Sequence, residues 1–334
     1  MRRLFLFLIA AVALSGGLAA ATSATPPAKV DGVPQFGNVF VIIGENYNYS
    51  QVTANNSPYL INHIKPESAW LTNYWAATHY SESNYVAMTS GQFTPCEQAD
   101  GSIASCHQDV PNLFNQLDTQ YGAGAWTSWM ESMPSPCYID SFGSDAGLNK
   151  YRAKHNPAEV YDDVAGTWNA GVLTPSTECT TQDIPTGGTG PNDTSTFDDA
   201  LAAGNVSRFN FIVPNECEDA HDNCKPVGNP ELQYDAFLQR EVPQILRSPA
   251  FGSNGVLIVT FDEADTNSPN RALKFDNGGE VAFALVSPLA NPGEYGNLWT
   301  HYSFLRTLQD GLGTSAQGYL GRAGTASSIN TIWK

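Results

Sequence analysis

The stretch that decides the fold is Asn38–Asn46, NVFVIIGEN, a short and almost continuous apolar run that ends in Gly44-Glu45-Asn46. A run of this length, rich in β-branched residues, is typical of a strand that is buried on both faces, as in a parallel sheet. Similar runs recur along the chain, at Phe209–Val213, Gly255–Phe261 and Val281–Val286, with a weaker candidate at Ala125–Met130.

Segments with helical character lie between these runs, at Tyr85–Ser90, Glu231–Arg247 and Ser303–Leu312. Alternating strands and helices predict an α/β fold with a mostly parallel central β-sheet flanked by helices. We expect one domain over residues 37–334, with a long irregular insertion around 166–200, where Gly, Thr, Pro and Asp are frequent.

Polar side chains follow three of the predicted strands, where each strand ends. In an open α/β sheet the ligand crevice lies outside the carboxyl ends of the strands. The three segments should therefore bring carboxylates, an amide and an imidazole to one edge of the sheet. The residues concerned are Glu45 and Asn46 after the first strand, Asp219 and His221 after Phe209–Val213, and Asp262 and Glu263 after Gly255–Phe261.

The oxygen-rich set Glu45, Asn46, Asp262 and Glu263 suits a hard or borderline divalent cation. Each group also has a structural interpretation. Glu45 and Asn46 could cap a helix, and Asp262 and Glu263 could form a solvated turn. Unpaired charge directly after an apolar strand is costly, however, and a lone histidine such as His221 is more often structural than catalytic.

The segment His79–Tyr85, HYSESNY, contains a hydroxyl that could act as a nucleophile. Ser81 beside a metal ion could be deprotonated. Asn84, three residues on, could lie one helical turn away with its amide directed at phosphate oxygens. An N-cap serine at the start of a helix explains Ser81 equally well.

The N-terminus has the pattern of an export signal. Arg2 and Arg3 precede the apolar run Leu4–Leu14, and small residues follow. We expect a signal peptide over residues 1–24 and a linker over 25–36, and hence a secreted or periplasmic protein. The apolar run is too short to cross a bilayer, and no other stretch approaches the required length, so no stable membrane span is expected.

Six cysteines in an exported chain indicate three disulfides, because the compartment is oxidising and no CxxC pair is present. Proximity along the chain favours Cys217 with Cys224 and Cys96 with Cys106, which leaves Cys137 with Cys179, although six cysteines permit many pairings.

The formal net charge of −17 argues against nucleic acid or an anionic membrane as the main partner. A protein this acidic that binds an anionic phosphate needs local positive charge, and only 16 Lys and Arg residues are present. A bound divalent metal ion would supply that charge.

At these residues the chain resembles the bacterial phosphoesterase family of secreted acid phosphatases and phospholipases C, a branch of the alkaline-phosphatase-like superfamily. The matching segments occur in the family's order and cover roughly residues 38–313. They are Gly44-Glu45-Asn46, His79–Tyr85 with Thr89-Ser90-Gly91, Glu131-Ser132-Met133-Pro134, Lys154-His155-Asn156-Pro157, Pro214-Asn215 with Asp219 and His221, Phe261-Asp262-Glu263, and His301-Tyr302-Ser303.

The resemblance implies a role for each of these positions. Glu45, Asn46, Asp262 and Glu263 would bind the metal, and Ser81 would be both a metal ligand and the nucleophile that forms a phosphoserine. Asn84 would hold the transferring phosphoryl group, and His155 and His221 would contact phosphate or protonate the leaving oxygen. Asp219 and His301 lie in matching segments, and Arg152 and Lys154 could add positive charge near the pocket mouth or be exposed.

The resemblance therefore implies a secreted, metal-dependent phosphomonoesterase, an acid phosphatase acting on a phosphate-ester small molecule or a phospholipid head group such as a phosphoinositide. The family's phospholipases often have a DEHGG-type stretch, whereas Asp262–Asn267 reads DEADTN, which favours the phosphatase branch. A phospholipase C is the nearest alternative, and a secreted binding protein without turnover is an alternative of another class.

The abundance of carboxylates leads to one expectation about pH. Surrounding carboxylates should raise the pKa of His155 and His221, so that imidazolium persists in mildly acidic solution. A protonated imidazole gains most from a dianionic monoester. We therefore expect phosphomonoesters to be better substrates than diesters, with an optimum on the acid side of neutral.

Overall fold

The computed structural model describes residues 29–96, 99–265 and 278–334. The predicted signal peptide at 1–24 lies outside the described residues. In the part of the chain that is described, no helix has both the length and the apolar character needed to cross a membrane.

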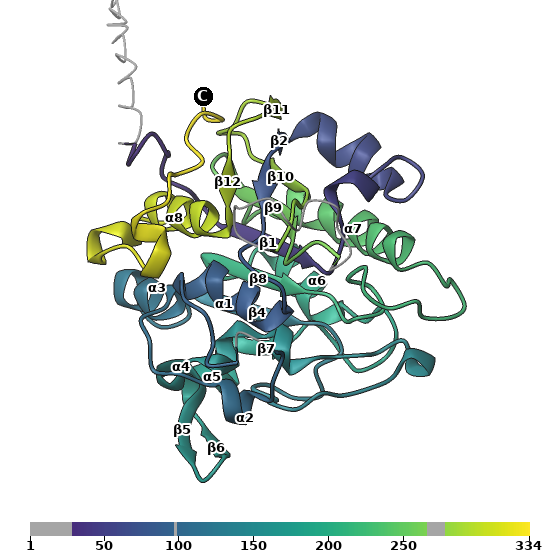
Figure 1. Cartoon of the computed structure of the whole chain (residues 1–334), viewed down its shortest axis with the longest axis vertical. Helices are drawn as coiled ribbons and strands as arrows, with labels where there is room; N and C mark the ends of the chain where they lie inside the picture. Colours follow the sequence, from purple (N-terminus) through teal and green to yellow (C-terminus); the bar gives the residue numbers. More distant parts are fainter. Residues whose placement is uncertain (1–28, 97–98, 266–277) are drawn as a thin grey trace, which may run out of the picture.

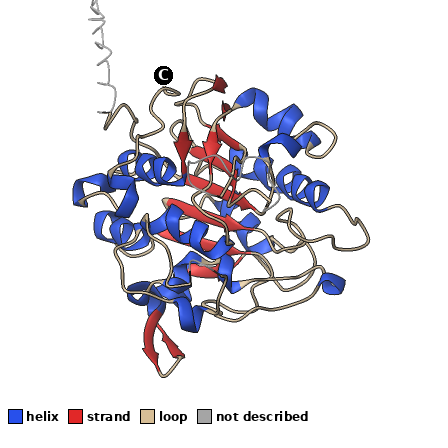
Figure 2. Ribbon diagram, in the orientation of Figure 1, coloured by secondary structure: helices blue, strands red, loops and turns tan. Residues whose placement is uncertain are grey.

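The centre of the fold is a sheet in the order β11-β2-β10-β9-β1-β8-β4-β7, with helices packed around it (Figures 1 and 2). The strands are β1 Val39–Gly44, β2 Ala69–Leu71, β3 Tyr74–Trp75, β4 Trp126–Met130, β5 Gly166–Asn169, β6 Val172–Pro175, β7 Asp183–Pro185, β8 Phe209–Val213, β9 Val256–Phe261, β10 Phe283–Val286, β11 Gly293–Tyr295 and β12 Trp299–Thr300. The helices are α1 Ser81–Ser90, α2 Ile103–Cys106, α3 Leu113–Tyr121, α4 Asp162–Ala165, α5 Thr177–Gln182, α6 Ser195–Ala203, α7 Pro230–Arg247 and α8 His301–Gly311.

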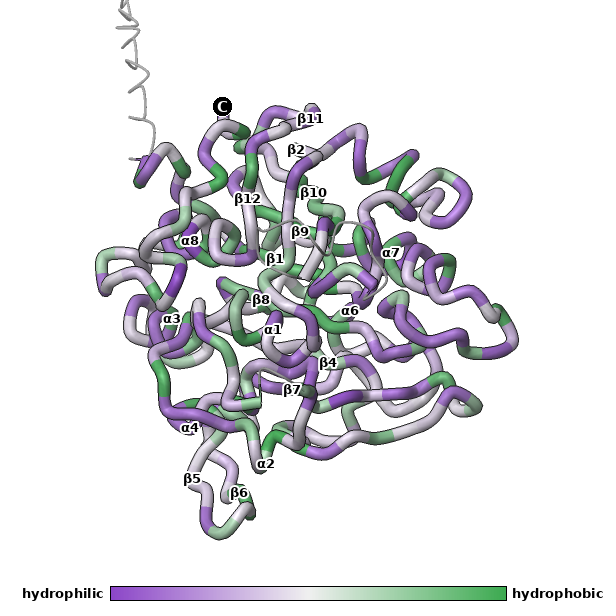
Figure 3. The backbone as a smooth tube through the Cα atoms, in the orientation of Figure 1, coloured by the Kyte–Doolittle hydropathy of each residue, from purple (hydrophilic) through white to green (hydrophobic). Residues whose placement is uncertain are grey.

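The middle of the sheet confirms the α/β prediction. β1 pairs in parallel with β8 on one side and with β9 on the other, and β4 pairs in parallel with both β8 and β7. Every residue of β1, β8 and β9 is buried, as expected for strands that are covered on both faces. Figure 3 shows hydrophobic residues concentrated in these central strands and hydrophilic residues in the outer loops.

Side chains of β4 explain why helices cover both faces. Trp126 packs against Phe114 of α3, with ring centroids 4.5 Å apart, and Trp129 packs against Phe197 of α6 at 5.1 Å. Residues three apart in a strand point to opposite faces. α3 and α6 therefore lie on opposite sides of the sheet.

One of the predicted strands, β10, is antiparallel to its neighbours. β10 pairs antiparallel with both β9 and β2, so the sheet is mostly but not entirely parallel. Its residues are nearly all buried, so an apolar run marks it as a strand without revealing its direction.

The insertion around 166–200 is more ordered than expected. β5 and β6 form an antiparallel hairpin that projects from the body of the protein (Figure 1). β7 then adds an edge strand to the central sheet by pairing with β4. β7 is only three residues long and contains an aspartate and a proline, so it carries none of the apolar pattern that reveals the other strands.

The described part of the expected linker is packed against the domain. Val33 and Phe36 are buried, and the Phe36 N–H donates a hydrogen bond to the Gly311 carbonyl of α8 at 2.8 Å. The predicted disulfides are confirmed, since Cys96 bonds Cys106, Cys137 bonds Cys179 and Cys217 bonds Cys224.

Candidate active site

The carboxyl ends of β9, β1 and β8 meet at one edge of the sheet, and backbone hydrogen bonds fix the residues just beyond them. The Asp262 N–H donates to the Gly44 carbonyl at 2.9 Å, and the Glu45 N–H donates to the Asp219 carbonyl at 2.7 Å. The Asn46 N–H donates to Asp262 Oδ1 at 3.2 Å. The convergence predicted from three separate apolar runs is therefore present.

Three carboxylates occupy this edge in a buried position. Glu45 and Asp262 are 0% exposed and Glu263 is 3% exposed. Burial, reinforced by the neighbouring Asp262, raises the pKa of Glu45 well above its usual value. Burial and the neighbouring Glu263 do the same for the pKa of Asp262. Glu45 Oε1 and Asp262 Oδ2 accept no hydrogen bond from the described residues, so the cluster has oxygens that are available to a ligand.

Ser81 is the first residue of α1 and lies against this cluster. Its Oγ donates to Glu45 Oε2 at 2.9 Å, and Asn46 Nδ2 donates to the same oxygen at 3.2 Å. Tyr80, just before the helix, has a φ of 84°, a strained conformation for a residue with a side chain. Ser81 therefore stands at a helix N-terminus, where the helix dipole favours negative charge, and a strained residue fixes its entry.

Asn84 does not direct its amide at a substrate in this structure. Its Oδ1 accepts from the backbone N–H groups of Ala77 and Thr78 at 3.0 and 3.1 Å. Its Nδ2 donates to the carbonyls of Thr78 and Tyr80 at 2.7 and 3.4 Å. A carboxamide has two donor hydrogens and two acceptor lone pairs, so the side chain is fully used in holding the turn that precedes Ser81.

His155 lies beside the carboxylate cluster and is 2% exposed. Its Nε2 is 3.1 Å from Glu45 Oε1, and its Nδ1 is 3.8 Å from Asp219 Oδ2. The ring stacks on Tyr85 of α1, with centroids 5.2 Å apart and planes 17° apart. These contacts bring His155 and Ser81 to opposite oxygens of the same carboxylate, Glu45.

His221 is half-buried at the rim of the site. Its backbone N–H donates to Asp219 Oδ1 at 2.9 Å, and its Nδ1 is 2.7 Å from Asp222 Oδ1. Together with Asn46 it lines a pocket of about 300 Å³, whose other lining residues are Tyr47, Gln51, Ala220, Pro230, Glu231 and Asp265. This pocket opens beside the predicted metal ligands.

The expected rise in histidine pKa is wrong for both residues. Burial lowers the pKa of His155 well below its usual value, and the nearby Lys154 lowers it further. Burial also lowers the pKa of His221, although Glu216 acts in the opposite direction. At His221, the loss of solvation of the imidazolium outweighs the field of Glu216.

His79 contacts the cluster and is absent from the predicted site. Its Nδ1 lies 2.5 Å from Glu263 Oε2, and both side chains are buried. The available signal is its place two residues before Ser81 in the segment His79–Tyr85. Only the hydroxyl and the amide of that segment carry predicted roles, because a lone histidine in a sequence is weak evidence for a site.

His301, the first residue of α8, supports the site by contacting the residue that follows β9. Its Nε2 is 2.5 Å from the Asp262 carbonyl, and its Nδ1 is 2.8 Å from the Tyr74 hydroxyl. Burial lowers its pKa to about 4. His301 is thus a neutral, fully buried residue that holds the backbone of a predicted metal ligand.

Comparison with known proteins agrees with this arrangement. A sequence model of the phosphoesterase family matches residues 50–313. The chain belongs to the phosphoesterase family. It is 26% identical over 298 residues to the phosphate-repressible acid phosphatase of Penicillium chrysogenum, covering 88% of this chain and 63% of that protein. It is 27% identical over 307 residues to the phosphatidylinositol-3-phosphatase of Mycobacterium tuberculosis, covering 90% and 84%. The chain thus spans less than two thirds of the fungal relative.

Solved structures place this phosphoesterase in a wider fold group. It resembles the lipoteichoic acid synthase LtaP of Listeria monocytogenes with a TM-score of 0.54 and 15% identity, covering 90% of this chain and 81% of that one. It also resembles an alkaline phosphatase superfamily protein of Vibrio parahaemolyticus with a TM-score of 0.54 and 11% identity, covering 85% and 68%. The fold is alkaline-phosphatase-like, as predicted.

Two basic residues near the site of this phosphoesterase are paired with acids. Lys150 Nζ is 2.8 Å from Asp145 and also contacts Glu216 and Asp222, while Arg152 Nε is 2.9 Å from Glu216. These pairs reduce the positive field that Lys150 and Arg152 can offer a phosphate.

Lys154 differs, because the site residue Glu45 affects its pKa directly. Its Nζ is 2.8 Å from Asp100 Oδ2. Burial acts to lower its pKa, but the fields of Glu45 and Asp100 outweigh burial and raise the pKa above its usual value. Lys154 is therefore a permanent cation within electrostatic range of Glu45.

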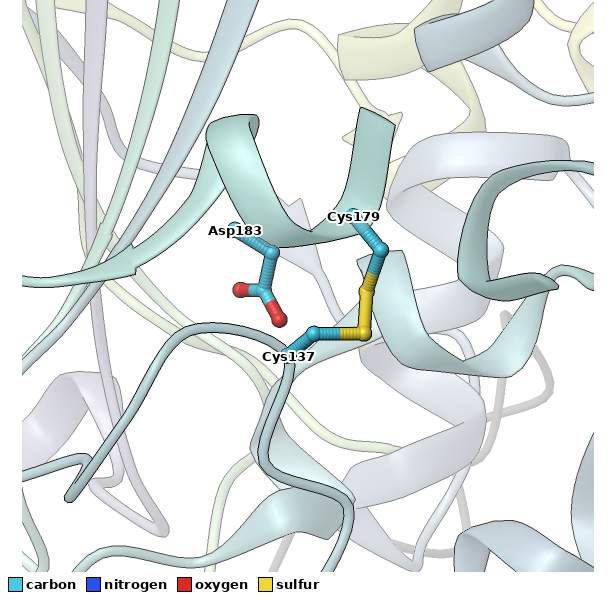
Figure 4. A group of neighbouring side chains, drawn as sticks. All are labelled: Cys137, Cys179 and Asp183. Carbon is cyan, nitrogen blue, oxygen red and sulfur yellow. A yellow bond between two sulfur atoms is a disulfide. The ribbon is translucent and has the colours of Figure 1, made fainter. Parts of the chain in front are cut away.

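Other groups of possible metal ligands fit a metal poorly. Cys137, Cys179 and Asp183 gather in one place, but both sulfurs are used in a disulfide (Figure 4). Glu216 and Asp222 gather with His221, but the ammonium of Lys150 already contacts both carboxylates. The buried carboxylates around Glu45 are oxygen ligands, the kind that hard divalent ions prefer.

Proposed function

We propose that this protein is an exported, metal-dependent phosphomonoesterase, an acid-phosphatase-like enzyme that works through a phosphoserine at Ser81. The observation that carries the proposal is the contact between Ser81 Oγ and Glu45, a buried carboxylate with a spare oxygen beside Asp262. Membership of the phosphoesterase family and similarity to proteins named acid phosphatase support the reaction class.

The metal site in this proposal consists of Glu45, Asn46, Asp262 and Glu263, with Ser81 as a further ligand. Three buried carboxylates in one cluster would repel one another strongly unless a cation or protons compensated them. Two of their oxygens have no hydrogen bond from the described residues, which suits a divalent cation whose identity stays open. Such an ion would supply positive charge to the serine oxygen and to the phosphate.

Ser81 carries the nucleophilic step. Its proton can pass to Glu45 Oε2, to which it is already hydrogen-bonded. The serine oxygen then attacks phosphorus in line as the alcohol departs, and water hydrolyses the phosphoserine in a second step. Asn84 contributes by holding the turn before Ser81 rather than by contacting the phosphoryl group.

His155 and His221 serve the phosphate and the leaving oxygen in this proposal. Burial lowers the pKa values of both, which favours their neutral forms at neutral pH. A neutral imidazole can donate a hydrogen bond from one nitrogen and accept one at the other. Lys154 adds a fixed positive charge, since its pKa is raised. Asp219, whose Oδ1 accepts from the backbone of His221, positions that histidine.

The substrate in this proposal is a phosphate monoester, either a small molecule or the head group of a phospholipid. One relative is named phosphatidylinositol-3-phosphatase, which makes a phosphoinositide a candidate. Three disulfides support export to an oxidising compartment.

Phosphate release from 4-nitrophenyl phosphate tests the proposal, before and after exhaustive chelation and metal replacement. Ser81→Ala should lower turnover at least about a thousandfold, as loss of a nucleophile does. Ser83→Ala is the matched control, since Ser83 lies in the same turn but its Oγ is 3.4 Å from Thr94 instead of the carboxylates. Full activity after chelation, or in Ser81→Ala, would reject the mechanism.

A further inference from the structure

A second pocket, of about 300 Å³, is lined in part by Lys154. Lys154 is the cation whose pKa is raised by Glu45 of the carboxylate cluster. Its lining is divided by polarity. The buried Ile103 and Ala153, with the half-buried Ile139, form an apolar floor, whereas the rim is polar and largely exposed. The remaining lining residues are Gly101, Ser102, Asp140, Ser141 and Lys154.

Two independent connections place this pocket next to the proposed reaction centre. On one side, Asp100 Oδ1 accepts from the Glu82 N–H at 3.2 Å, and the Gly101 N–H donates to Glu82 Oε2 at 3.0 Å. Glu82 directly follows Ser81. On the other side, the pocket residue Lys154 precedes His155 in the chain and contacts Asp100 at 2.8 Å.

The walls of the pocket are held by two of the three disulfides. Gly101, Ser102 and Ile103 lie inside the loop closed by Cys96–Cys106, and Ile139–Ser141 begin two residues after Cys137, which bonds Cys179.

Gly101 packs so closely that an added Cβ would lie 2.2 Å from Cys106 Sγ. Loops are ordinarily the mobile part of a fold, so two crosslinks at one pocket indicate a cavity that is formed before a ligand enters.

The lining also indicates what the pocket can hold. An apolar floor with a hydroxyl-rich rim suits a ring that has C–H bonds on its face and hydroxyls at its edge. Ser102 and Ser141 can donate or accept hydrogen bonds, and the Asp140 carboxylate accepts them from hydroxyls. The cation Lys154 is already paired with Asp100. A second phosphate on the substrate would therefore meet the Asp140 carboxylate, while the charge of Lys154 is offset by Asp100, and like charges repel.

The pocket beside Asn46 and His221 is less suitable for such a ring. Among the described residues that line it, Glu231 and Asp265 carry negative charge and none is a lysine or arginine. Its place next to the proposed metal ligands suits water, or a phosphate whose charge the metal ion would compensate.

We infer that the pocket between Gly101–Ile103 and Ile139–Ser141 is the subsite for the alcohol portion of the substrate, and that it accepts an uncharged polyhydroxylated ring such as a monosaccharide. This inference rests on the proposed phosphomonoesterase function and adds the substrate class to it. Its volume is at the lower end for ligand pockets, which run from about 300 to 1,000 Å³. A sugar monophosphate is thus preferred to a sugar bisphosphate.

The experiment compares kcat/KM for glucose 6-phosphate, fructose 1,6-bisphosphate and 4-nitrophenyl phosphate in the full-length, metal-loaded protein. The wild type should prefer glucose 6-phosphate to the bisphosphate. In Ser141→Ala and Asp140→Ala, the ratio of kcat/KM for glucose 6-phosphate to that for 4-nitrophenyl phosphate should fall by about threefold to tenfold, the effect of one lost hydrogen bond. The nitrophenyl ring has no hydroxyls to lose.

Ser135→Ala is the matched control, because Ser135 is exposed, lies two residues before Cys137 and does not line the pocket. It should leave the ratio unchanged. An unchanged ratio in both pocket variants, or a wild type that prefers the bisphosphate, would overturn the subsite while leaving the phosphatase function intact. A wild type that hydrolyses none of the three substrates would overturn the proposed function and the subsite with it.

Discussion

Replacing Glu45 by glutamine should abolish activity and yet stabilise the metal-free protein. Glu45 is 0% exposed, and Asp262 and Glu263 are its neighbours. Without a cation, the fold must bury this carboxylate against like charge. Glutamine keeps the shape and an oxygen that can accept the hydrogen bonds from Ser81 and Asn46, but it removes the charge.

The size of the effect depends on the pKa of Glu45, which burial and Asp262 raise well above the usual value. A carboxyl group whose pKa is raised on folding binds more protons in the folded state, so its contribution to stability falls as pH rises above the unfolded value. Replacing buried charge by uncharged side chains of similar volume can stabilise a protein by about 1 to 4 kcal/mol, so we expect a gain of about 2 kcal/mol in Glu45→Gln at pH 8.

Thermal unfolding of the chelated proteins measures this gain. For a domain of about 300 residues, an unfolding entropy of about 2.1 cal/mol/K per residue makes one kcal/mol correspond to about 1.5 °C in Tm, so the variant should melt roughly 3 °C higher at pH 8. The difference should shrink toward zero near pH 4.5, where Glu45 is largely protonated in the folded state and half-protonated in the unfolded state. Adding the metal should raise the Tm of the wild type and leave the variant nearly unchanged.

Glu67→Gln is the control, because Glu67 is exposed and distant from the cluster in the chain. It should alter the Tm little at either pH. If chelated Glu45→Gln melts no higher than the chelated wild type at pH 8, or if metal stabilises both proteins equally, the buried-charge argument for the metal site is refuted.

Particular contacts lead to three more expected outcomes. Asn84→Ala removes four hydrogen bonds to the turn before Ser81 and should cost about 2 to 4 kcal/mol in chemical unfolding, with a larger fall in kcat than rise in KM. Burial raises the pKa of Asp183 to about 7, beside the buried Glu159, so the wild type loses stability as Asp183 ionises. The Tm of Asp183→Asn relative to that of the wild type should therefore rise as the pH increases from 5 to 8. A Tm difference that does not change with pH would contradict the raised pKa. Replacing Cys217 and Cys224 by serine should lower stability by about 2.5 kcal/mol, as expected for a short closed loop, and should reduce activity further by loosening the loop that carries His221.

Sequence alone predicts the central part of the fold, because a strand buried on both faces is a continuous apolar run in the sequence. β1, β8 and β9 are continuous apolar runs, and each ends in the polar residues that a parallel sheet gathers at one edge. The structure puts these three strands side by side, with β1 between the other two. The apolar runs do not show which strands are neighbours in the sheet. The polar residues that follow each of the three strands are the best indication in the sequence that these strands lie side by side.

The features that sequence reasoning missed depend on partners far away in the chain. β7 is recognisable only from its pairing with β4, and the direction of β10 only from its neighbours β9 and β2. Spacing to Ser81 assigns Asn84 to phosphate. Spacing cannot show that the backbone of Ala77–Tyr80 folds over the amide and uses all of its hydrogen-bonding capacity.

The histidines show why counting charges in a sequence can give the wrong sign. Carboxylates outnumber basic residues twofold, 33 to 16, so a rise in histidine pKa is the natural expectation. His155 is nonetheless buried, and the cost of desolvating an imidazolium, together with the nearby positive charge of Lys154, lowers its pKa. A bound divalent cation would lower it further, because like charges disfavour the protonated form. An acid optimum of activity would therefore not arise from protonation of His155. A His155→Gln variant keeps a hydrogen-bonding side chain but cannot titrate. It should be slower than the wild type and should retain the acid limb of the pH profile of kcat/KM. If that limb disappears in the variant, titration of His155 does cause the acid optimum.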